Sequence, residues 1–153
     1  MRTDEESVRM QLQQNAIEPQ MVPQIDTYIL VVDDDDNLCQ AIQVVLEEEG
    51  FVVETALDGK EALEQVARQR PAMIVLDIGL PLLDGETVAR ELRARYGMTI
   101  PVMLMTVDAH VKEKAHRLKA VMGIGKPFEI EAFLTAVRQT LSSRRGKASM
   151  PSS

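Results

Sequence analysis

Five short apolar runs, separated by segments with helical periodicity, dominate the middle of this sequence. They lie at 28–32, 51–55, 72–76, 100–105 and, more weakly and with two glycines, 121–125. Strands this rich in apolar residues are typical of a sheet that is covered on both faces. Helices between such strands imply parallel pairing. We therefore predict an α/β fold, a doubly wound (βα)5 parallel sheet in a single domain.

The intervening segments carry helix start and stop signals. Leucine, alanine and valine recur at helical spacing over 38–46, and Gly50 is a stop signal. Asp58, with Glu61 three residues later, predicts a capping box for a helix that buries Ala62, Leu63, Val66 and Ala67. Asp84 predicts the cap of a helix that Gly97 ends. Residues 111–119 and 129–141 complete the predicted helices.

The ends of the chain differ in composition from its middle. Residues 1–27 are rich in Gln and Glu and contain two prolines, so we predict a flexible N-terminal extension. Residues 28–141 form the predicted domain. Residues 142–153 hold three basic residues and no acidic one, which favours a flexible basic tail. The 153 residues suffice for one ordinary domain.

Charge and cysteine content exclude several classes of protein. The formal net charge of −7 argues against direct nucleic-acid binding by this chain. A single cysteine, Cys39, rules out an intramolecular disulfide and a cysteine-based zinc site. The acidic N-terminus lacks the apolar run of a signal peptide, and no apolar stretch approaches the roughly 20 residues of a membrane span. We expect a cytoplasmic protein without membrane contact.

Polar residues gather where the predicted strands end. Asp33 and Asp34 follow the first strand, Asp77 the third, Thr106 the fourth and Lys126 the fifth. Ligands bind at the carboxyl ends of the strands in such sheets, so these side chains should converge. Three carboxylates in one pocket repel each other unless a hard cation such as Mg²⁺ or Mn²⁺ is bound. A lysine and a hydroxyl nearby suit a phosphoryl group, and an aspartate can accept one.

These residues resemble the receiver domain of two-component response regulators. The resemblance is carried by 29–35 (ILVVDDD), 77–85 (DIGLPLLDG), Thr106 and 126–128 (KPF), in order and at receiver-like spacing. It covers about 28–141 and implies a flavodoxin-like sheet of strand order 2-1-3-4-5. It also implies that Lys126-Pro127 is a cis peptide bond.

The resemblance implies a role for each residue of the pocket. Asp77 would accept a phosphoryl group from the phosphohistidine of a histidine kinase, in a Mg²⁺-dependent step. Lys126 would pair with the phosphoryl oxygens, and Thr106 would donate its hydroxyl to them. The implied metal ligands are Asp34, Asp77 and the carbonyl oxygen of Gly79, with Asp33 acting through a metal-bound water.

Two positions depart from the usual receiver pattern. The residue three before the strand-five lysine is usually Tyr or Phe and is Gly123 here, so an aromatic rotamer switch is impossible. The residue after Thr106 is usually small and is Val107 here. We expect Val107 to crowd the site, and we therefore hypothesise that phospho-Asp77 is shielded from water and decays slowly.

The implied partners are a sensor histidine kinase or phosphotransfer protein and a downstream effector protein. Residues after 141 are too few for an effector domain, so output would use protein contacts or a phosphorelay unless a further domain exists. Two alternatives stay open: a pseudo-receiver that binds partners without phosphorylation, and a Mg²⁺-dependent aspartyl-phosphate phosphohydrolase. The second lacks its usual acid two residues after the nucleophile, where Gly79 stands. We therefore expect a signalling domain and no enzyme.

Overall fold

The structure is a computed structural model that describes residues 28–80 and 84–149, with the side chains of 144–149 left out. The predicted extension 1–27 and the last residues of the predicted tail lie outside the described part. Within the described residues, five strands alternate with five helices. The strands are β1 Tyr28–Val32, β2 Val52–Ala56, β3 Met73–Asp77, β4 Val102–Thr106 and β5 Met122–Gly125. The helices are α2 Asp36–Glu48, α3 Gly59–Arg68, α4 Gly85–Tyr96, α5 Val111–Arg117 and α6 Ile130–Ser149.

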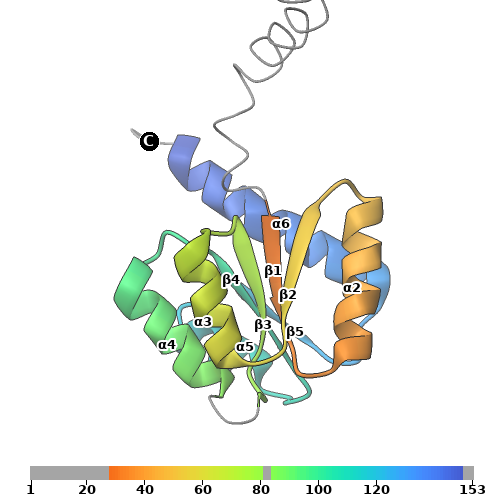
Figure 1. Cartoon of the computed structure of the whole chain (residues 1–153), viewed down its shortest axis with the longest axis horizontal. Coiled ribbons are helices and arrows are strands. Elements are labelled where there is room, and N and C mark those ends of the chain that lie inside the picture. Colours follow the sequence, from red (N-terminus) through yellow and green to blue (C-terminus); the bar gives the residue numbers. More distant parts are fainter. Residues whose placement is uncertain (1–27, 81–83, 150–153) are drawn as a thin grey trace, which may run out of the picture.

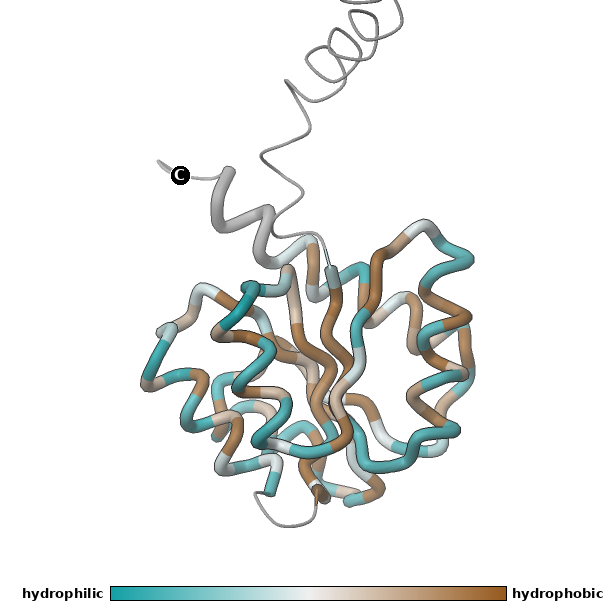
Figure 2. Tube along the Cα trace, viewed as in Figure 1, coloured by the Kyte–Doolittle hydropathy of each residue, from teal (hydrophilic) through white to brown (hydrophobic). Residues whose placement is uncertain are grey.

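The five strands form one parallel sheet of order β2-β1-β3-β4-β5, as the sequence predicted. In β1, β3 and β4 every residue is buried, because helices cover both faces of these central strands. Figure 1 shows the sheet between its helices, and Figure 2 shows brown apolar strands flanked by helices that alternate between apolar and polar. The parallel arrangement brings all five carboxyl ends to one edge of the sheet.

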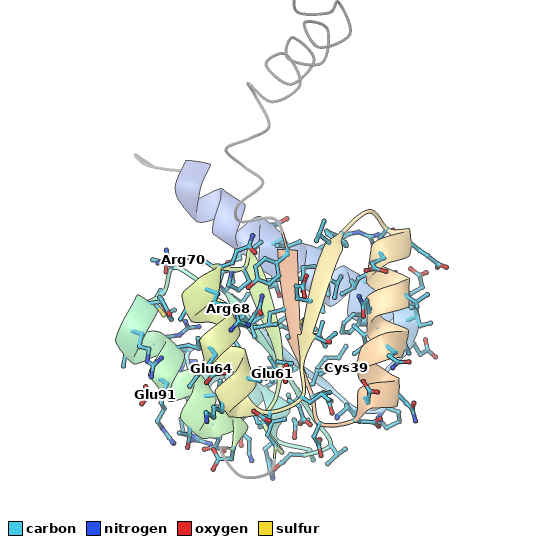
Figure 3. All side chains as sticks on the ribbon, viewed as in Figure 1. Cys39, Glu61, Glu64, Arg68, Arg70 and Glu91 are labelled. Atoms are coloured by element: carbon cyan, nitrogen blue, oxygen red, sulfur yellow. The ribbon has the colours of Figure 1, made fainter. Side chains whose placement is uncertain are left out.

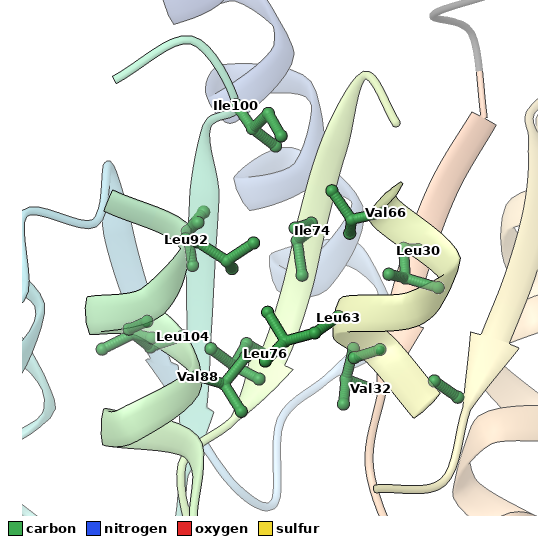
Figure 4. Close-up of a cluster of buried hydrophobic side chains, with 14 of the residues drawn as sticks. Leu30, Val32, Leu63, Val66, Ile74, Leu76, Val88, Leu92, Ile100 and Leu104 are labelled. Atoms are coloured by element: carbon green, nitrogen blue, oxygen red, sulfur yellow. The ribbon is translucent and has the colours of Figure 1, made fainter. Parts of the chain in front are cut away.

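The two faces of the sheet carry separate hydrophobic clusters. One face is covered by α3, α4 and α5, and its core is shown in Figure 4, where Leu63 and Val88 meet Leu76. The other face is covered by α2 and α6, with Ile42, Leu46 and Phe133 among its buried residues. Burying such side chains stabilises the fold by about 1.5–3 kcal/mol each before the entropic cost of ordering them.

The helix boundaries agree with the predicted caps at several points. The side chain of Asp84 accepts a hydrogen bond from the backbone N–H of Thr87, and Gly97 ends α4 with φ of +64°. Ala67, predicted to be buried on α3, is exposed, because the helix turns it away from the sheet beyond Val66. The last helix was predicted to end at Leu141 and continues to Ser149, so most of the predicted basic tail is helical backbone.

The single cysteine is buried in the first helix of the domain. Cys39 lies between α2 and the sheet (Figure 3), and its thiol donates a hydrogen bond to the backbone oxygen of Asp33 at 3.3 Å. Burial, followed by the charge of Asp33, raises the pKa of Cys39 to about 12, so the thiol stays protonated and unreactive at neutral pH.

Among the helices of the described residues, none combines the length and the apolar character that a membrane span requires.

The N-terminal cap of α3 gives a direct test of this local structure, although the Glu61 side chain reaches the N–H one residue before the cap and so does not close the predicted capping box on Asp58. Asp58 accepts a hydrogen bond from the Glu61 N–H at 2.8 Å, and the Glu61 carboxylate accepts one from the Leu57 N–H at 2.9 Å. We expect Asp58→Ala to lower the free energy of unfolding by about 1 kcal/mol, measured by urea denaturation. Glu64→Ala, at an exposed position of the same helix, is the control and should change stability by less than about 0.5 kcal/mol. Equal effects of the two changes would contradict the role of the cap.

Candidate functional site

The predicted pocket residues meet at the carboxyl edge of the sheet. Asp33 and Asp34 directly follow β1, Asp77 is the last residue of β3, and Thr106 is the last residue of β4. Lys126 follows β5, and its backbone N–H donates to the carbonyl oxygen of Thr106 at 2.8 Å. The edge forms because each of these strands runs in the same direction and ends at the same level.

One lysine joins two of the carboxylates. The Nζ of Lys126 lies 2.9 Å from Oδ2 of Asp33 and 3.5 Å from Oδ2 of Asp77. Asp33 is fully buried and Asp77 nearly so, so these contacts are shielded from water and stronger than surface ion pairs. Lys126 therefore links β5 to β1 and β3 across the pocket.

The pKa values reflect this crowding of charge. Burial raises the pKa of Asp77, and the negative charge of Asp33 adds to the effect, while the Gly79 N–H and Lys126 oppose it. Burial by itself lowers the pKa of Lys126, but its hydrogen bond to Asp33 and the charges of both aspartates outweigh it and raise that pKa. The ammonium group stays charged at neutral pH, as a partner of an anionic group must.

The acidic residues fit a hard metal ion. One carboxylate oxygen each from Asp33, Asp34 and Asp77 lies within 4.8 Å of the other two. The donors are all oxygens, which Mg²⁺ prefers, and Asp34 is exposed, so solvent can supply further ligands. The charges of these four groups do not balance, because one lysine faces three carboxylates, and a divalent cation would offset the negative surplus.

Thr106 is held in a defined position by the loop that follows β4. Its Oγ1 accepts a hydrogen bond from the Asp108 N–H at 3.0 Å, and Asp108 in turn pairs with Lys114 of α5 at 2.9 Å. Lys114 also lies 3.8 Å from Glu86 in the first turn of α4. A chain of polar contacts thus connects the hydroxyl at the pocket to the two helices beside it.

The two departures from the receiver pattern have different outcomes. Val107 is 79% exposed, and the slow decay of phospho-Asp77 that its bulk led us to expect stays a prediction. At position 123, where receivers usually have an aromatic residue, the packing of α5 leaves no room for a side chain. A Cβ atom at this position would lie 2.5 Å from Cγ2 of Val111 and 3.2 Å from its backbone oxygen. Helix α5 therefore occupies space that a side chain at 123 would need.

Comparison with known proteins identifies the family. The sequence matches the family model of the response regulator receiver domain over residues 29–138. The chain belongs to this family. The receiver domain is 41% identical over 115 residues to "Response regulator MprA" of Mycobacterium leprae, covering 74% of this chain and 50% of that protein. The chain thus spans about half the length of the curated relatives it matches.

Solved structures agree with this assignment. A putative response regulator from Chloroflexus aurantiacus superposes with a TM-score of 0.72 at 30% identity, over 76% of this chain and 98% of that one. A CheY-like receiver domain from Methanospirillum hungatei has a TM-score of 0.73 over 80% of this chain and 98% of that one. At 22% identity the second shows the fold alone. The family model and the first of these structures together identify residues 29–138 as a response regulator receiver domain.

Sequence reasoning missed the contacts around Lys114. The segment 111–119 reads as a short charged helix, and nothing in its pattern says which charge faces Asp108 or Glu86. The close approach of Val111 to Gly123 was also missed, although a glycine inside a strand is a known signal of close packing. The predicted cis peptide at Lys126-Pro127 is present.

The packing at Gly123 predicts a destabilised variant that a second change rescues. Gly123→Ala should lower the free energy of unfolding by about 1–3 kcal/mol, because the new methyl group overlaps Val111. In the double variant with Val111→Ala, the loss should be clearly smaller than the sum of the two single losses in urea denaturation. Additive losses would show that Val111 does not limit position 123.

The raised pKa of Asp77 predicts that its charge destabilises the metal-free fold. A carboxylate with a raised pKa costs stability once it ionises, so that cost is present at pH 7 and vanishes below the ordinary Asp value of 3.8. Asp77→Asn should therefore raise the urea midpoint at pH 7 in EDTA, and the gain should disappear as the pH falls toward 3.8. A lower midpoint at pH 7 would mean that Asp77 is a net stabilising partner of Lys126.

Proposed function

We propose that this receiver domain accepts a phosphoryl group on Asp77 in a Mg²⁺-dependent reaction. The observation that carries the proposal is the convergence of Asp33, Asp34 and Asp77 on one side and Lys126 on the other at the strand ends. A phosphohistidine of a sensor kinase or phosphotransfer protein is the proposed donor. The result would be a shift in the population of two conformations and in the affinity for an effector protein.

The hydrogen bonds suggest which oxygen of Asp77 reacts. Oδ1 accepts the Gly79 N–H at 2.9 Å, whereas Oδ2 faces Lys126. We assign Oδ2 as the nucleophile: it forms a bond to phosphorus while the phosphorus–nitrogen bond of the phosphohistidine breaks, and the imidazole keeps the electron pair. Lys126 would then stabilise the added negative charge on the phosphoryl oxygens.

The proposed metal ligands divide into direct and indirect ones. Oδ1 of Asp33 accepts the Asp35 N–H at 2.9 Å, and its Oδ2 lies 2.9 Å from the Nζ of Lys126, closer than the 3.5 Å of the Asp77 contact, so Asp33 is the carboxylate held more tightly by the lysine. This supports contact through a metal-bound water. Asp34 and Asp77 would bind the ion directly, together with the carbonyl oxygen of Gly79. The ion would supply charge neutralisation for an incoming phosphoryl group.

Thr106 is the proposed link between phosphorylation and the rest of the domain. Its hydroxyl would leave the Asp108 N–H and donate to a phosphoryl oxygen on Asp77. Because Asp108 pairs with Lys114, this movement would reach α5 through polar contacts and without an aromatic side chain at position 123. The effector itself is proposed to be another domain or protein, since the curated relatives are about twice as long as the matched segment.

A mass measurement tests the proposal. Incubation with acetyl phosphate and MgCl₂ should add one phosphoryl group to the intact protein, and EDTA should prevent the addition. Asp77→Asn should abolish the adduct, because an amide oxygen is too weak a nucleophile for this transfer. Asp36→Asn is a matched control from the same acidic run, since Asp36 is exposed and lies in the first turn of α2. It should be phosphorylated like the natural protein.

Other results would point to the alternatives. An adduct that persists in Asp77→Asn would overturn the site assignment. No adduct under any condition would favour the pseudo-receiver. Steady hydrolysis of a small phosphomonoester would favour the phosphohydrolase, although Gly79 leaves that reaction without its general acid.

A further inference from the structure

A positively charged cleft lies between α4 and α5, on elements that contribute no strand-end carboxylate. It has a volume of about 290 Å³ and is lined by Arg90, Arg93, Arg117, Leu118 and Lys119. Four of the five lining residues are basic, in a chain whose net charge is −7. The volume lies near the lower end of the range for small-molecule sites, about 300 Å³.

The cleft has more positive charge than its protein neighbours neutralise. Arg90 and Arg117 both pair with the same carboxylate, Glu86, at 3.4 and 3.3 Å. Glu86 also lies within 3.8 Å of Lys114, so it is shared among three basic side chains. Lys119 has no ion pair within the described residues. Within the described residues, the single carboxylate of Glu86 therefore pairs with a cluster that carries several positive charges, and it cannot neutralise them all.

Arg93 adds a further positive charge that has no negatively charged partner among the described residues. Its guanidinium donates to the carbonyl oxygens of Gly97, Ile100 and Lys119 at 3.0, 3.2 and 2.9 Å, and these partners are neutral. Its Nε is buried and has no hydrogen-bond partner in the described structure. Burial lowers the pKa of Arg93, which means that its charge is poorly solvated. Arg93 is half-buried, and a partly desolvated charge without an opposite charge is unfavourable, so an anion in the cleft would offset that cost.

We propose that this cleft binds a small phosphorylated molecule through its phosphoryl group. Guanidinium groups match the oxygens of phosphate in paired hydrogen bonds, and a phosphate dianion supplies the missing negative charge. Arg93 is already fixed by its three carbonyl contacts, while Arg90 and Arg117 have half or more of their side chains exposed and can reorient. Leu118 and the aliphatic stems of the arginines offer an apolar wall to the remainder of the ligand.

The shape of the site favours a small molecule over a protein partner. The five lining residues form a cleft of about 290 Å³ beside the two helices, a volume that suits a phosphorylated small molecule. The cleft shares no lining residue with the acidic pocket at the strand ends, so binding to it can be measured on the unphosphorylated protein. Failure of one proposal therefore leaves the other intact.

Calorimetric titration of the full chain with adenosine 5′-monophosphate and with inorganic pyrophosphate tests the proposal. The titrations are made in EDTA, so that no metal ion recruits phosphate to the acidic pocket. Both probes should bind saturably, and the double variant Arg90→Gln/Arg117→Gln should weaken binding by about tenfold or more, since each arginine contributes a charge-assisted hydrogen bond.

Arg95→Gln is the matched control for this experiment. Arg95 lies on the same helix and pairs with Glu91 at 3.2 Å, outside the cleft. Its loss should not change the affinity. In a ¹H–¹⁵N spectrum, the Nε–H signal of Arg93 should shift on addition of adenosine 5′-monophosphate while that of Arg95 stays in place.

Three results would overturn the proposal. The first is that adenosine 5′-monophosphate or inorganic pyrophosphate fails to bind saturably. The second is an equal loss of affinity in Arg95→Gln, which would show general attraction to anions. The third is tighter binding of a polyglutamate peptide than of adenosine 5′-monophosphate, which would assign the surface to an acidic protein partner.

Discussion

The ammonium group of Lys126 holds together a pocket that would otherwise repel itself. Asp33, Asp34 and Asp77 bring three negative charges to one edge of the sheet, and two of these residues are buried. The lysine reaches both buried carboxylates from a strand on the other side of β4. The parallel sheet is what makes this possible, since its strands deliver residues from distant parts of the chain to one level.

This arrangement concentrates three of the 24 acidic residues of the chain in one pocket. The pocket is under-neutralised by the protein alone, and the charge imbalance is a reason to bind a divalent cation and then a phosphoryl group. The opposite imbalance occurs between α4 and α5, where four basic residues line one cleft. A net charge of −7 therefore averages over two local surpluses of opposite sign, and it describes neither of them.

Much of the fold could be read from the sequence because its signals are local. Apolar runs gave the strands, and Asp58 and Asp84 marked helix starts that the structure confirms through their cap hydrogen bonds. The convergence of Asp33, Asp77 and Lys126 followed from the rule that parallel strands end at one edge. The end of α6 was missed, because Ser142 and Ser143 look like a tail in sequence and nothing local stops the helix.

Features that depend on side-chain packing were not accessible in the same way. The exposure of Val107 depends on the direction of one side chain in a loop, which residue type does not determine. The pairing of Lys114 with Asp108 depends on how α5 is rotated against the sheet. The partial neutralisation of the α4–α5 cleft depends on Glu86, a residue that reads in sequence as an ordinary first-turn acid.

The contact between Val111 and Gly123 constrains how this protein can evolve. Because α5 rests directly on the strand at Gly123, a larger residue there is disfavoured until position 111 has become smaller. The order of substitutions then matters: the same two changes pass through a viable intermediate in one order and through a destabilised one in the other. Among descendants of this sequence, positions 111 and 123 should therefore covary in size.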